Sequence, residues 1–490
     1  MSLESVTVIG GGLAGLSSAV ALADAGLRVR LFEKRPHLGG RATSYFLPDG
    51  SEIDNCQHVT LGCCTNLADF YRRVGAQDKI RFYERMSFVD KGGRRFAIGP
   101  TAFLPPPFHM APSFLRFAAL SWKDKNGIAR ALLKIAVSGG KPPGAAGTSM
   151  LHWLHRMKQT PAAIERFWRV VLVSALDEEL SRADAQYGID VFWKAFLANR
   201  QGFRMGIPTV PLGALYGECR SAIERRGGQV RLRAVVKRIE VSSDGAPTVI
   251  LDDGSEWRDD ALLVTVPQDA LLGMLPQALC DREPVFEALR HLHNSPVTGI
   301  HFWFDREVMR EPFITLLDHT VQWVFNRSVL AQPDVDHGNR RGTKPRGGAS
   351  APWTQKTGQY LQLVISASYD LVSSSRQEII DLGLRDLHDV LPATRDAQLL
   401  KATVIKEVAA AFSPEPGSDQ WRPGARTPFP NFFLAGDWTR TGWPATMEGA
   451  VRSGYLAAEA ILEAAGRPQK FVVPDLPVEG FCRLWAARTA

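Results

Sequence analysis

A glycine-rich turn near the N-terminus constrains the fold more than any other feature of this sequence. Val6–Ile9 reads as a short buried strand, and Gly10-Gly11-Gly12-Leu13-Ala14-Gly15 follows it at once and opens the helical stretch Ala14–Ala25. The glycines match G-x-G-x-x-G in its required context, between a strand and a helix. We expect Gly10 to make the turn, Gly12 to admit a pyrophosphate and Gly15 to let helix and strand pack closely. The pattern predicts a βαβ unit that binds a dinucleotide.

An acidic residue supports the same interpretation. Glu33 ends the second predicted strand, Arg28–Phe32, eighteen residues after Gly15. A carboxylate at this place accepts hydrogen bonds from the two ribose hydroxyls and disfavours a 2′-phosphate. The alternative is a glycine-rich turn of a doubly wound sheet that binds no dinucleotide, and NAD would satisfy these residues as well as FAD.

Two further segments decide between the dinucleotides. Gly39-Gly40-Arg41-Ala42 follows Glu33 closely, and its arginine can pair with a phosphate in bidentate fashion. Near the C-terminus, Phe433-Leu434-Ala435-Gly436-Asp437-Trp438 is followed by Met447-Glu448-Gly449-Ala450. With these motifs at both ends, the chain resembles the flavin amine oxidase and phytoene desaturase superfamily over nearly its whole length.

That resemblance implies FAD as the cofactor and a two-domain α/β fold, with a Rossmann-type FAD domain and a mixed-sheet substrate domain. It places the FAD domain in 1–98, 208–290 and 425–466, the substrate domain in 99–207 and 291–424, and a tail in 467–490. It also implies that Asp437 bonds the ribityl or phosphate region, that the helix near Glu448 points at the flavin, and that Val236 meets the adenine. The expected cofactor-binding residues are Gly10, Gly12, Leu13, Ala14, Gly15, Glu33, Lys34, Gly40, Arg41, Val236, Gly436, Asp437, Met447 and Ala450.

A more specific resemblance lies in Ile53-Asp54-Asn55-Cys56-Gln57-His58-Val59-Thr60-Leu61-Gly62-Cys63-Cys64-Thr65-Asn66-Leu67. This segment is similar to the bacterial hydroxysqualene dehydroxylases of hopanoid synthesis, which implies reductive removal of an allylic hydroxyl to give squalene. His58 or Asp54 is then the candidate proton donor, and Gln57 the residue that orients the hydroxyl. The alternative is a polar turn in which Asp54 and Asn55 satisfy backbone groups and His58 packs as a half-buried polar residue.

Two other functions remain open at this stage. A carotenoid-type desaturase or an amine oxidase would run the flavin in the opposite direction and abstract hydride. A lipid-binding protein without catalysis, like the Rab GDP-dissociation inhibitors, would use the same scaffold. Since no second G-x-G-x-x-G follows a strand, we expect an external electron donor instead of a dedicated NAD(P)H domain.

Composition limits the partners and the location. At 490 residues two domains are expected, and no stretch reaches the roughly 18 uncharged apolar residues of a membrane span. The N-terminus lacks a secretory signal, which predicts a cytoplasmic protein, and the six cysteines have no metal spacing, so neither disulfide nor metal is expected. The net charge of +7 is spread along the chain, which disfavours nucleic acid.

Three regions outside the motifs carry their own expectations. The segment 103–137 is rich in aromatic and basic residues and is a candidate for peripheral contact with the inner face of the cell membrane, although a buried amphipathic helix would look similar. The polar stretch Pro333–Gly358 is predicted to be a mobile loop. A tunnel for an isoprenoid chain, or ordinary core packing, would explain Phe192, Trp193, Phe196, Phe302, Trp303, Phe304, Trp323 and Phe325.

Overall fold

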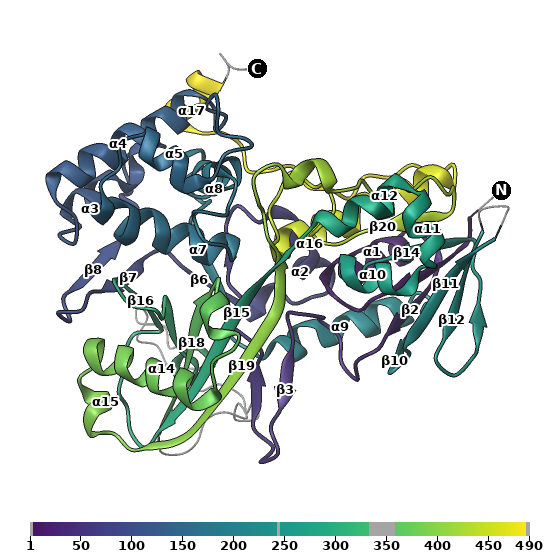
Figure 1. The fold of residues 1–490 in the computed structure, drawn as a ribbon, viewed down its shortest axis with the longest axis horizontal. Helices are drawn as coiled ribbons and strands as arrows, with labels where there is room; N and C mark the ends of the chain where they lie inside the picture. The colour runs from purple at the N-terminus through teal and green to yellow at the C-terminus, as the bar shows by residue number, and fades with distance from the viewer. Residues whose placement is uncertain (1–2, 243–245, 333–357, 487–490) are drawn as a thin grey trace, which may run out of the picture.

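A five-stranded parallel sheet forms the centre of the nucleotide-binding part of the chain (Figure 1). The computed structural model describes residues 3–242, 246–332 and 358–486. The sheet draws on four distant segments, and every strand falls inside the ranges predicted for the FAD domain. In sheet order the strands are β10 (Gln229–Leu232), β2 (Arg28–Glu33), β1 (Ser5–Ile9), β14 (Ala261–Val264) and β20 (Phe432–Leu434).

Helices from opposite ends of the chain pack together beside this sheet. α1 (Leu13–Asp24) begins immediately after β1, as predicted, and α16 (Met447–Ala464) lies against it. The approach is so close that a Cβ on Gly454 would stand 2.4 Å from the carbonyl oxygen of Ala14. This contact joins the N-terminal and C-terminal motifs in one core, to which α2 (Thr65–Arg73) and α9 (Leu212–Glu224) also contribute.

The apolar pattern of the sequence predicts one continuous strand over 229–241, and this prediction is wrong. β10 ends at Leu232, and β11 (Val236–Val241) pairs instead with β12 (Pro247–Leu251) in a separate three-stranded sheet that also contains β13 (Glu256–Trp257). Arg233, with φ of +57°, turns the chain between the two sheets. The apolar pattern alone could not reveal this break, because both halves are half-buried strands.

The second large sheet has seven strands and belongs to the other domain. The sequence pattern predicts a strand over 319–328, but β17 covers only Trp323–Asn326, and helix α13 (Arg327–Leu330) follows it. β7 and β8 lie within 1–98, the first range predicted for the FAD domain, but they pair with the strands of the seven-stranded sheet. The predicted boundary at 98 therefore comes after these two strands, although the sheet groups them with the other domain. In order the strands are β19 (Leu399–Phe412), β15 (Asn294–Phe304), β18 (Gln359–Ser366), β17 (Trp323–Asn326), β16 (Phe313–Leu316), β7 (Met86–Val89) and β8 (Arg95–Ile98).

A helical lobe stands beside the seven-stranded sheet, in the upper left of Figure 1. Its core is built around buried Trp153, Trp168 and Phe192. The C-terminal helix α17 (Gly480–Ala486) returns to this lobe and packs against α4. The lobe also contains the helices α3 (Ala111–Arg116), α4 (Trp122–Val137), α5 (Met150–Arg156), α7 (Val170–Leu176) and α8 (Ala185–Val191).

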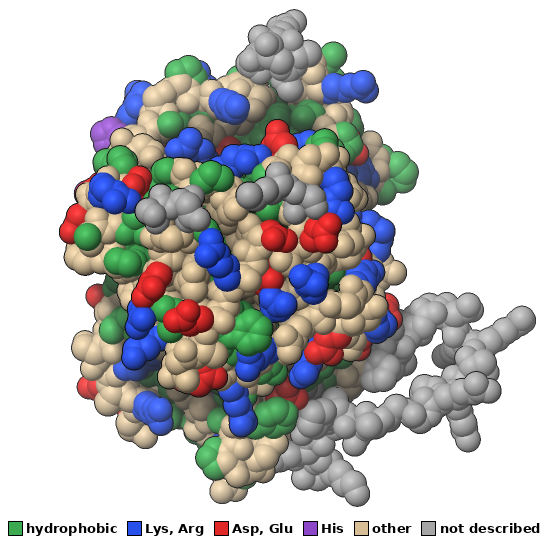
Figure 2. Space-filling view, turned by 90° about the vertical axis from the view of Figure 1, so that its right-hand side faces the viewer, with side chains coloured by type: hydrophobic (Ala, Val, Ile, Leu, Met, Phe, Trp, Pro, Cys, Tyr) green, Lys and Arg blue, Asp and Glu red, His purple; other side chains and the backbone are tan. Residues whose placement is uncertain are grey.

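The face of the molecule at the right of Figure 1 carries Lys and Arg interspersed with Asp and Glu (Figure 2). Within the described ranges, no helix is both long enough and apolar enough to cross a bilayer. The stretch predicted to be a mobile loop lies outside the described residues, apart from Gly358 at its end.

Candidate functional site

A single cavity of about 620 Å³ connects the two domains. One end is formed by the turn after β1 and the ends of β2, β14 and β20. The other end reaches α7, α8 and the face of the seven-stranded sheet. The cavity therefore passes from the predicted dinucleotide site into the predicted substrate domain without interruption.

The glycine motif gives this cavity an open helix end. No side chain caps the N-terminus of α1, whose first residues line the cavity together with Gly12. Gly15 does not line the cavity, but a Cβ there would stand 1.9 Å from the carbonyl oxygen of Gly10, which is the close packing predicted for it. Exposed N–H donors and the positive end of the helix dipole make this a site for a pyrophosphate.

The second glycine segment closes against the first. Gly39 and Gly12 form a bridge between their backbones, and Gly40 has φ of +63°. A Cβ on Gly40 would lie 2.9 Å from the Cα of Gly12. Any other residue at this position would both strain the backbone and push the two turns apart.

Glu33 lies at the end of β2, where the ribose carboxylate was predicted. Its Oε2 accepts a hydrogen bond from the N–H of Gly11 at 2.6 Å, and its Oε1 accepts one from the N–H of Arg35 at 2.7 Å. These two bonds fix the carboxylate on the cavity wall. Each oxygen retains a second lone pair that can accept from a ribose hydroxyl.

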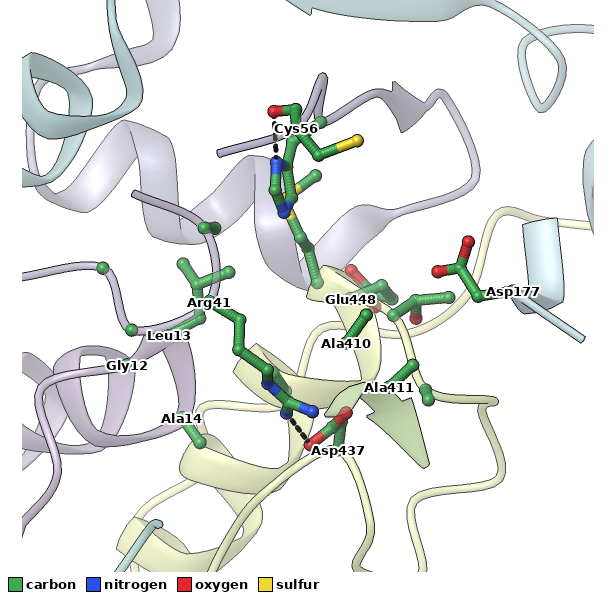
Figure 3. Close-up of a pocket in the computed structure, with 18 of the residues that line it drawn as sticks. Gly12, Leu13, Ala14, Arg41, Cys56, Asp177, Ala410, Ala411, Asp437 and Glu448 are labelled. Carbon is green, nitrogen blue, oxygen red and sulfur yellow. Dashed lines mark hydrogen bonds and ion pairs between the residues drawn. The ribbon is translucent and has the colours of Figure 1, made fainter. Parts of the chain in front are cut away.

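Arg41 and Asp437 form an ion pair on the cavity wall (Figure 3). The two motifs that carry them are 396 residues apart in the sequence. The side chains are 27% and 8% exposed, so the pair is partly shielded from water. It supplies a positive group for a phosphate and a carboxylate for a hydroxyl at the same point.

The remaining cofactor residues surround the same end of the cavity. α16 begins beside it, and its cap Thr446 accepts a hydrogen bond from the N–H of Gly449. The Glu448 carboxylate accepts from the N–H groups of Leu67 and Asn66 and so ties α16 to α2. The predicted residues that line the cavity are Gly10, Gly12, Leu13, Ala14, Glu33, Lys34, Gly40, Arg41, Val236, Gly436, Asp437, Met447 and Ala450. An uncapped helix end, a ribose carboxylate and a phosphate-binding arginine along one cavity fit FAD.

Asp54 is not on the cavity wall. Its Oδ1 accepts from the hydroxyl of Ser44 at 2.8 Å and from the N–H of Leu212 at 3.0 Å. Its Oδ2 pairs with Arg327 at 3.1 Å. Because the carboxylate is fully buried and held by groups from three segments, it joins the domains and does not face a substrate.

Gln57 and His58 do line the cavity. The Oε1 of Gln57 accepts from Arg327 at 2.7 Å. The Nδ1 of His58 lies 3.0 Å from the carbonyl oxygen of Cys56, so it carries the proton and leaves Nε2 as an acceptor in the neutral ring. Burial lowers the pKa of His58 below its ordinary value, which keeps the ring neutral near pH 7.

Asp177 is an acid that the sequence did not single out. It ends α7 in the left-handed conformation, with φ of +51°, and its side chain lines the cavity. In Figure 3 it lies apart from the Arg41–Asp437 pair. Ser366 donates to its Oδ1 at 2.8 Å, and burial raises its pKa to about 6. An Asp at the end of an apolar helix was the only signal in the sequence, and that signal is shared with ordinary helix caps.

The aromatic residues divide between cavity and core. Phe196, Trp323 and Phe325 line the cavity, as predicted for a tunnel. The others pack in hydrophobic clusters: Phe192 and Trp193 in the helical lobe, and Phe302, Trp303 and Phe304 in the seven-stranded sheet. A second acid, Asp190, lines the cavity with its pKa also raised by burial to about 6, and it accepts from Gln186.

Comparisons with known proteins agree with this site. The model of the flavin containing amine oxidoreductase family matches residues 13–462. The chain is 29% identical to the 15-cis-phytoene desaturase of Solanum lycopersicum, over 95% of this chain and 79% of the relative. It is 28% identical to the zeta-carotene desaturase of Synechocystis sp., over 96% of this chain and 99% of the relative.

The fold has a counterpart among solved structures. An oxidoreductase from Methanosarcina mazei superposes with a TM-score of 0.70 at 19% identity, over 94% of this chain and all of that one. The match to the family model includes the cavity from α1 to α16. The chain belongs to the flavin containing amine oxidoreductase family and is an FAD-dependent oxidoreductase.

Proposed function

We propose that the protein removes the allylic hydroxyl of hydroxysqualene by reduction and releases squalene. The observation that carries the proposal is the Asp177 carboxyl on the wall of the substrate end of the cavity. Loss of a hydroxyl requires a proton on the departing oxygen, whereas desaturation of a hydrocarbon requires none. The resemblance of 53–67 to the hydroxysqualene dehydroxylases supports the same substrate.

Burial shifts the pKa values of Asp177 and His58 in opposite directions. It raises the pKa of Asp177 to about 6, so the carboxyl can hold a proton closer to neutral pH than a free aspartate, and it lowers the pKa of His58, which keeps the imidazole neutral. A general acid works best when its pKa lies near the working pH. Asp177 is therefore the proton donor, and neutral His58 accepts a hydrogen bond through Nε2 and holds the hydroxyl or the water that leaves.

The surrounding wall suits an isoprenoid. Val171, Val191, Phe196, Trp323 and Phe325 line the same cavity as Asp177. Apolar walls exclude water, which would otherwise capture an allylic cation, and the aromatic faces stabilise positive charge. An amine substrate would leave this surface without a matching apolar group.

The reaction balances with one proton and one hydride. The C–O bond breaks with its electron pair, and the oxygen leaves as water with the proton from Asp177. Bound FAD in its reduced state supplies the hydride that the allylic carbon gains. An external two-electron donor must restore that state, and dithionite serves as the donor in the assay below.

The test is a single turnover under anaerobic conditions. The flavoprotein is reduced with dithionite, freed of excess reductant and mixed with hydroxysqualene while the flavin band and the products are followed. We expect the oxidised flavin band to return with one squalene formed per flavin. A flavin that stays reduced, with hydroxysqualene recovered unchanged, would contradict the proposal.

Two matched variants test the acid. Asp177→Asn preserves the shape of the side chain but has no proton to give, and we expect a loss of roughly 100-fold or more in the turnover rate with the flavin still bound. Asp190→Asn changes another acid in the same cavity whose pKa burial also raises to about 6, and this variant is expected to retain turnover. The opposite pattern would transfer the role to Asp190.

A carotenoid-type desaturase is the second candidate, and the names of the relatives favour it. It predicts that the oxidised protein is reduced by phytoene or a related polyene under anaerobic conditions. It also predicts that the rate rises with pH, because the reaction passes hydride to the flavin and a proton from carbon to a base, and protonates no oxygen.

A further inference from the structure

Apolar side chains on the outer surface of the helical lobe are exposed in a way that core packing does not explain. Phe103 is 93% exposed, Trp122 66% and Leu484 64%. Phe108, Leu115, Leu133, Val137 and Phe481 are each between 41% and 49% exposed. We name this set of eight residues the lobe patch.

The loop that carries Phe103 is held in place. The Arg200 guanidinium donates to the carbonyl oxygens of Thr101, Ala102 and Leu104, three of the residues around Phe103. Because three charge-assisted hydrogen bonds fix the loop, it holds the Phe103 ring exposed to water, where an apolar side chain is unfavourable. An exposed aromatic side chain on a rigid support is typical of a binding surface.

Segments far apart in the sequence build one end of the lobe patch. The ring of Phe108 lies 5.8 Å from the ring of Phe481, and the N–H of Phe481 donates to the carbonyl oxygen of Pro106 at 3.0 Å. Cys482, the next residue of α17, is buried against Leu197. The C-terminal helix is thus bonded to the loop through the backbone of Phe481 and held in the lobe by Cys482, while the side chains of Phe481 and Leu484 remain exposed.

α4 continues the lobe patch and adds charge. The structure describes all of α4, and its exposed positions fall in two neighbouring stripes. Trp122, Ala129, Leu133 and Val137, interrupted only by the polar Asn126, form a largely apolar stripe at helical spacing, and Lys123, Arg130 and Lys134 form a basic stripe beside it. The one acid of the helix, Asp124, is buried in the capping box with Ser121, so α4 presents only positive charge to the solvent.

We propose that the lobe patch docks the protein on the surface of an anionic lipid bilayer. Apolar side chains with an interfacial tryptophan, beside a row of Lys and Arg, match a membrane surface in both hydrophobicity and charge. The right-hand face of the molecule mixes both signs of charge and offers no such match (Figure 2). α4 (Trp122–Val137) has 16 residues and is anchored by buried Ile128 and Ile135, so it lies along the membrane plane. The inference is independent of the substrate.

The experiment is cosedimentation of the full-length FAD-loaded protein with vesicles at physiological salt. We expect binding to vesicles of phosphatidylcholine with phosphatidylglycerol, and at least roughly tenfold weaker binding to phosphatidylcholine alone. The double variant F103S/F481S should weaken binding roughly tenfold or more, since it removes two exposed rings. The matched control Leu400→Ser removes a residue that is 48% exposed on β19, far from the lobe, and should bind as the wild type does.

The charge contribution has its own pair of variants. K123Q/R130Q/K134Q should lose most of the preference for the anionic vesicles, whereas R225Q/K237Q/R258Q, with the same change in net charge on the FAD domain, should keep it. Hydrogen exchange should show protection of 101–137 and 480–486 when vesicles are added. Failure of the wild type to bind either vesicle, or equal binding by F103S/F481S and Leu400→Ser, would overturn the proposal.

Discussion

The guanidinium of Arg327 pairs with the carboxylate of Asp54 at 3.1 Å, with the two side chains 2% and 0% exposed. The same guanidinium donates to Gln57 on the cavity wall at 2.7 Å. Asp54 in turn receives the N–H of Leu212 at the start of α9. The pair thus connects α13, which follows β17 of the seven-stranded sheet, with Gln57 on the cavity wall and with the FAD domain. Asp54 therefore holds these parts together and is not placed to donate a proton to a group in the cavity.

This relationship predicts a large loss of stability from Arg327→Met. Removal of one partner leaves the Asp54 carboxylate buried without its countercharge, which typically costs about 3–5 kcal/mol in the free energy of unfolding. Urea unfolding measures it. The control Arg426→Gln breaks an exposed pair with Glu463, which should cost less than about 1 kcal/mol. Equal losses in the two variants would show that the buried pair has no special role.

The glycine turn predicts a variant that folds but does not retain FAD. An added Cβ at Gly12 would meet only the Cα of Gly40, at 3.8 Å, so Gly12→Ala fits the protein itself. The methyl group lines the cavity where the pyrophosphate is expected and should weaken FAD binding roughly tenfold or more. Fluorescence titration of the apoprotein measures the affinity.

A glycine outside the site serves as the control for this variant. A Cβ at Gly217 in α9 would have no heavy atom within 4 Å, and the residue does not line the cavity. Gly217→Ala should therefore leave FAD affinity unchanged and stabilise the helix by about 0.5–1 kcal/mol. Unchanged FAD affinity in Gly12→Ala would argue against a pyrophosphate at this turn.

The proposed acid predicts the direction of the pH dependence of turnover. Asp177 has a pKa raised to about 6 and donates a proton only in its protonated form. The rate of reoxidation of the reduced flavin by hydroxysqualene should therefore be highest below pH 6 and fall as the pH rises through that value. Stopped-flow absorbance measures it, and a rate that rises over the same interval would exclude Asp177 as the donor.

The same carboxyl also predicts a pH dependence of stability. Its pKa is higher in the folded protein than the unfolded value of about 3.9, so its contribution is present at low pH and is lost as the pH rises through about 6. The amide of Asp177→Asn does not ionise, so the variant does not lose this stability as the pH rises, and its side-chain oxygen can still accept a hydrogen bond from Ser366. The melting temperature of the variant relative to the wild type should therefore increase between pH 5 and pH 8. A constant difference would mean that the pKa of Asp177 is not raised.

The sequence alone was sufficient for the cofactor site because each of its parts is a local constraint. Gly10, Gly12 and Gly15 have spacing that only a tight turn with a close ligand requires, and Glu33 and Arg41 follow at distances fixed by one strand and one turn. Asp437 came from a second local motif. Such signals need no knowledge of what packs against them.

The tertiary structure alone decided which acid lines the cavity. The resemblance of 53–67 favoured Asp54, and nothing in the sequence singled out Asp177. Contacts with Ser44, Leu212 and Arg327 bury the first, whereas the left-handed end of α7 turns the second into the cavity. The partners lie 10 to 308 residues away in the sequence, for example Gln362, whose amide donates to the carbonyl oxygen of Asp54. Burial and pKa depend on such distant neighbours, so the local sequence determines where the flavin binds and the packing of the domains determines the chemistry beside it.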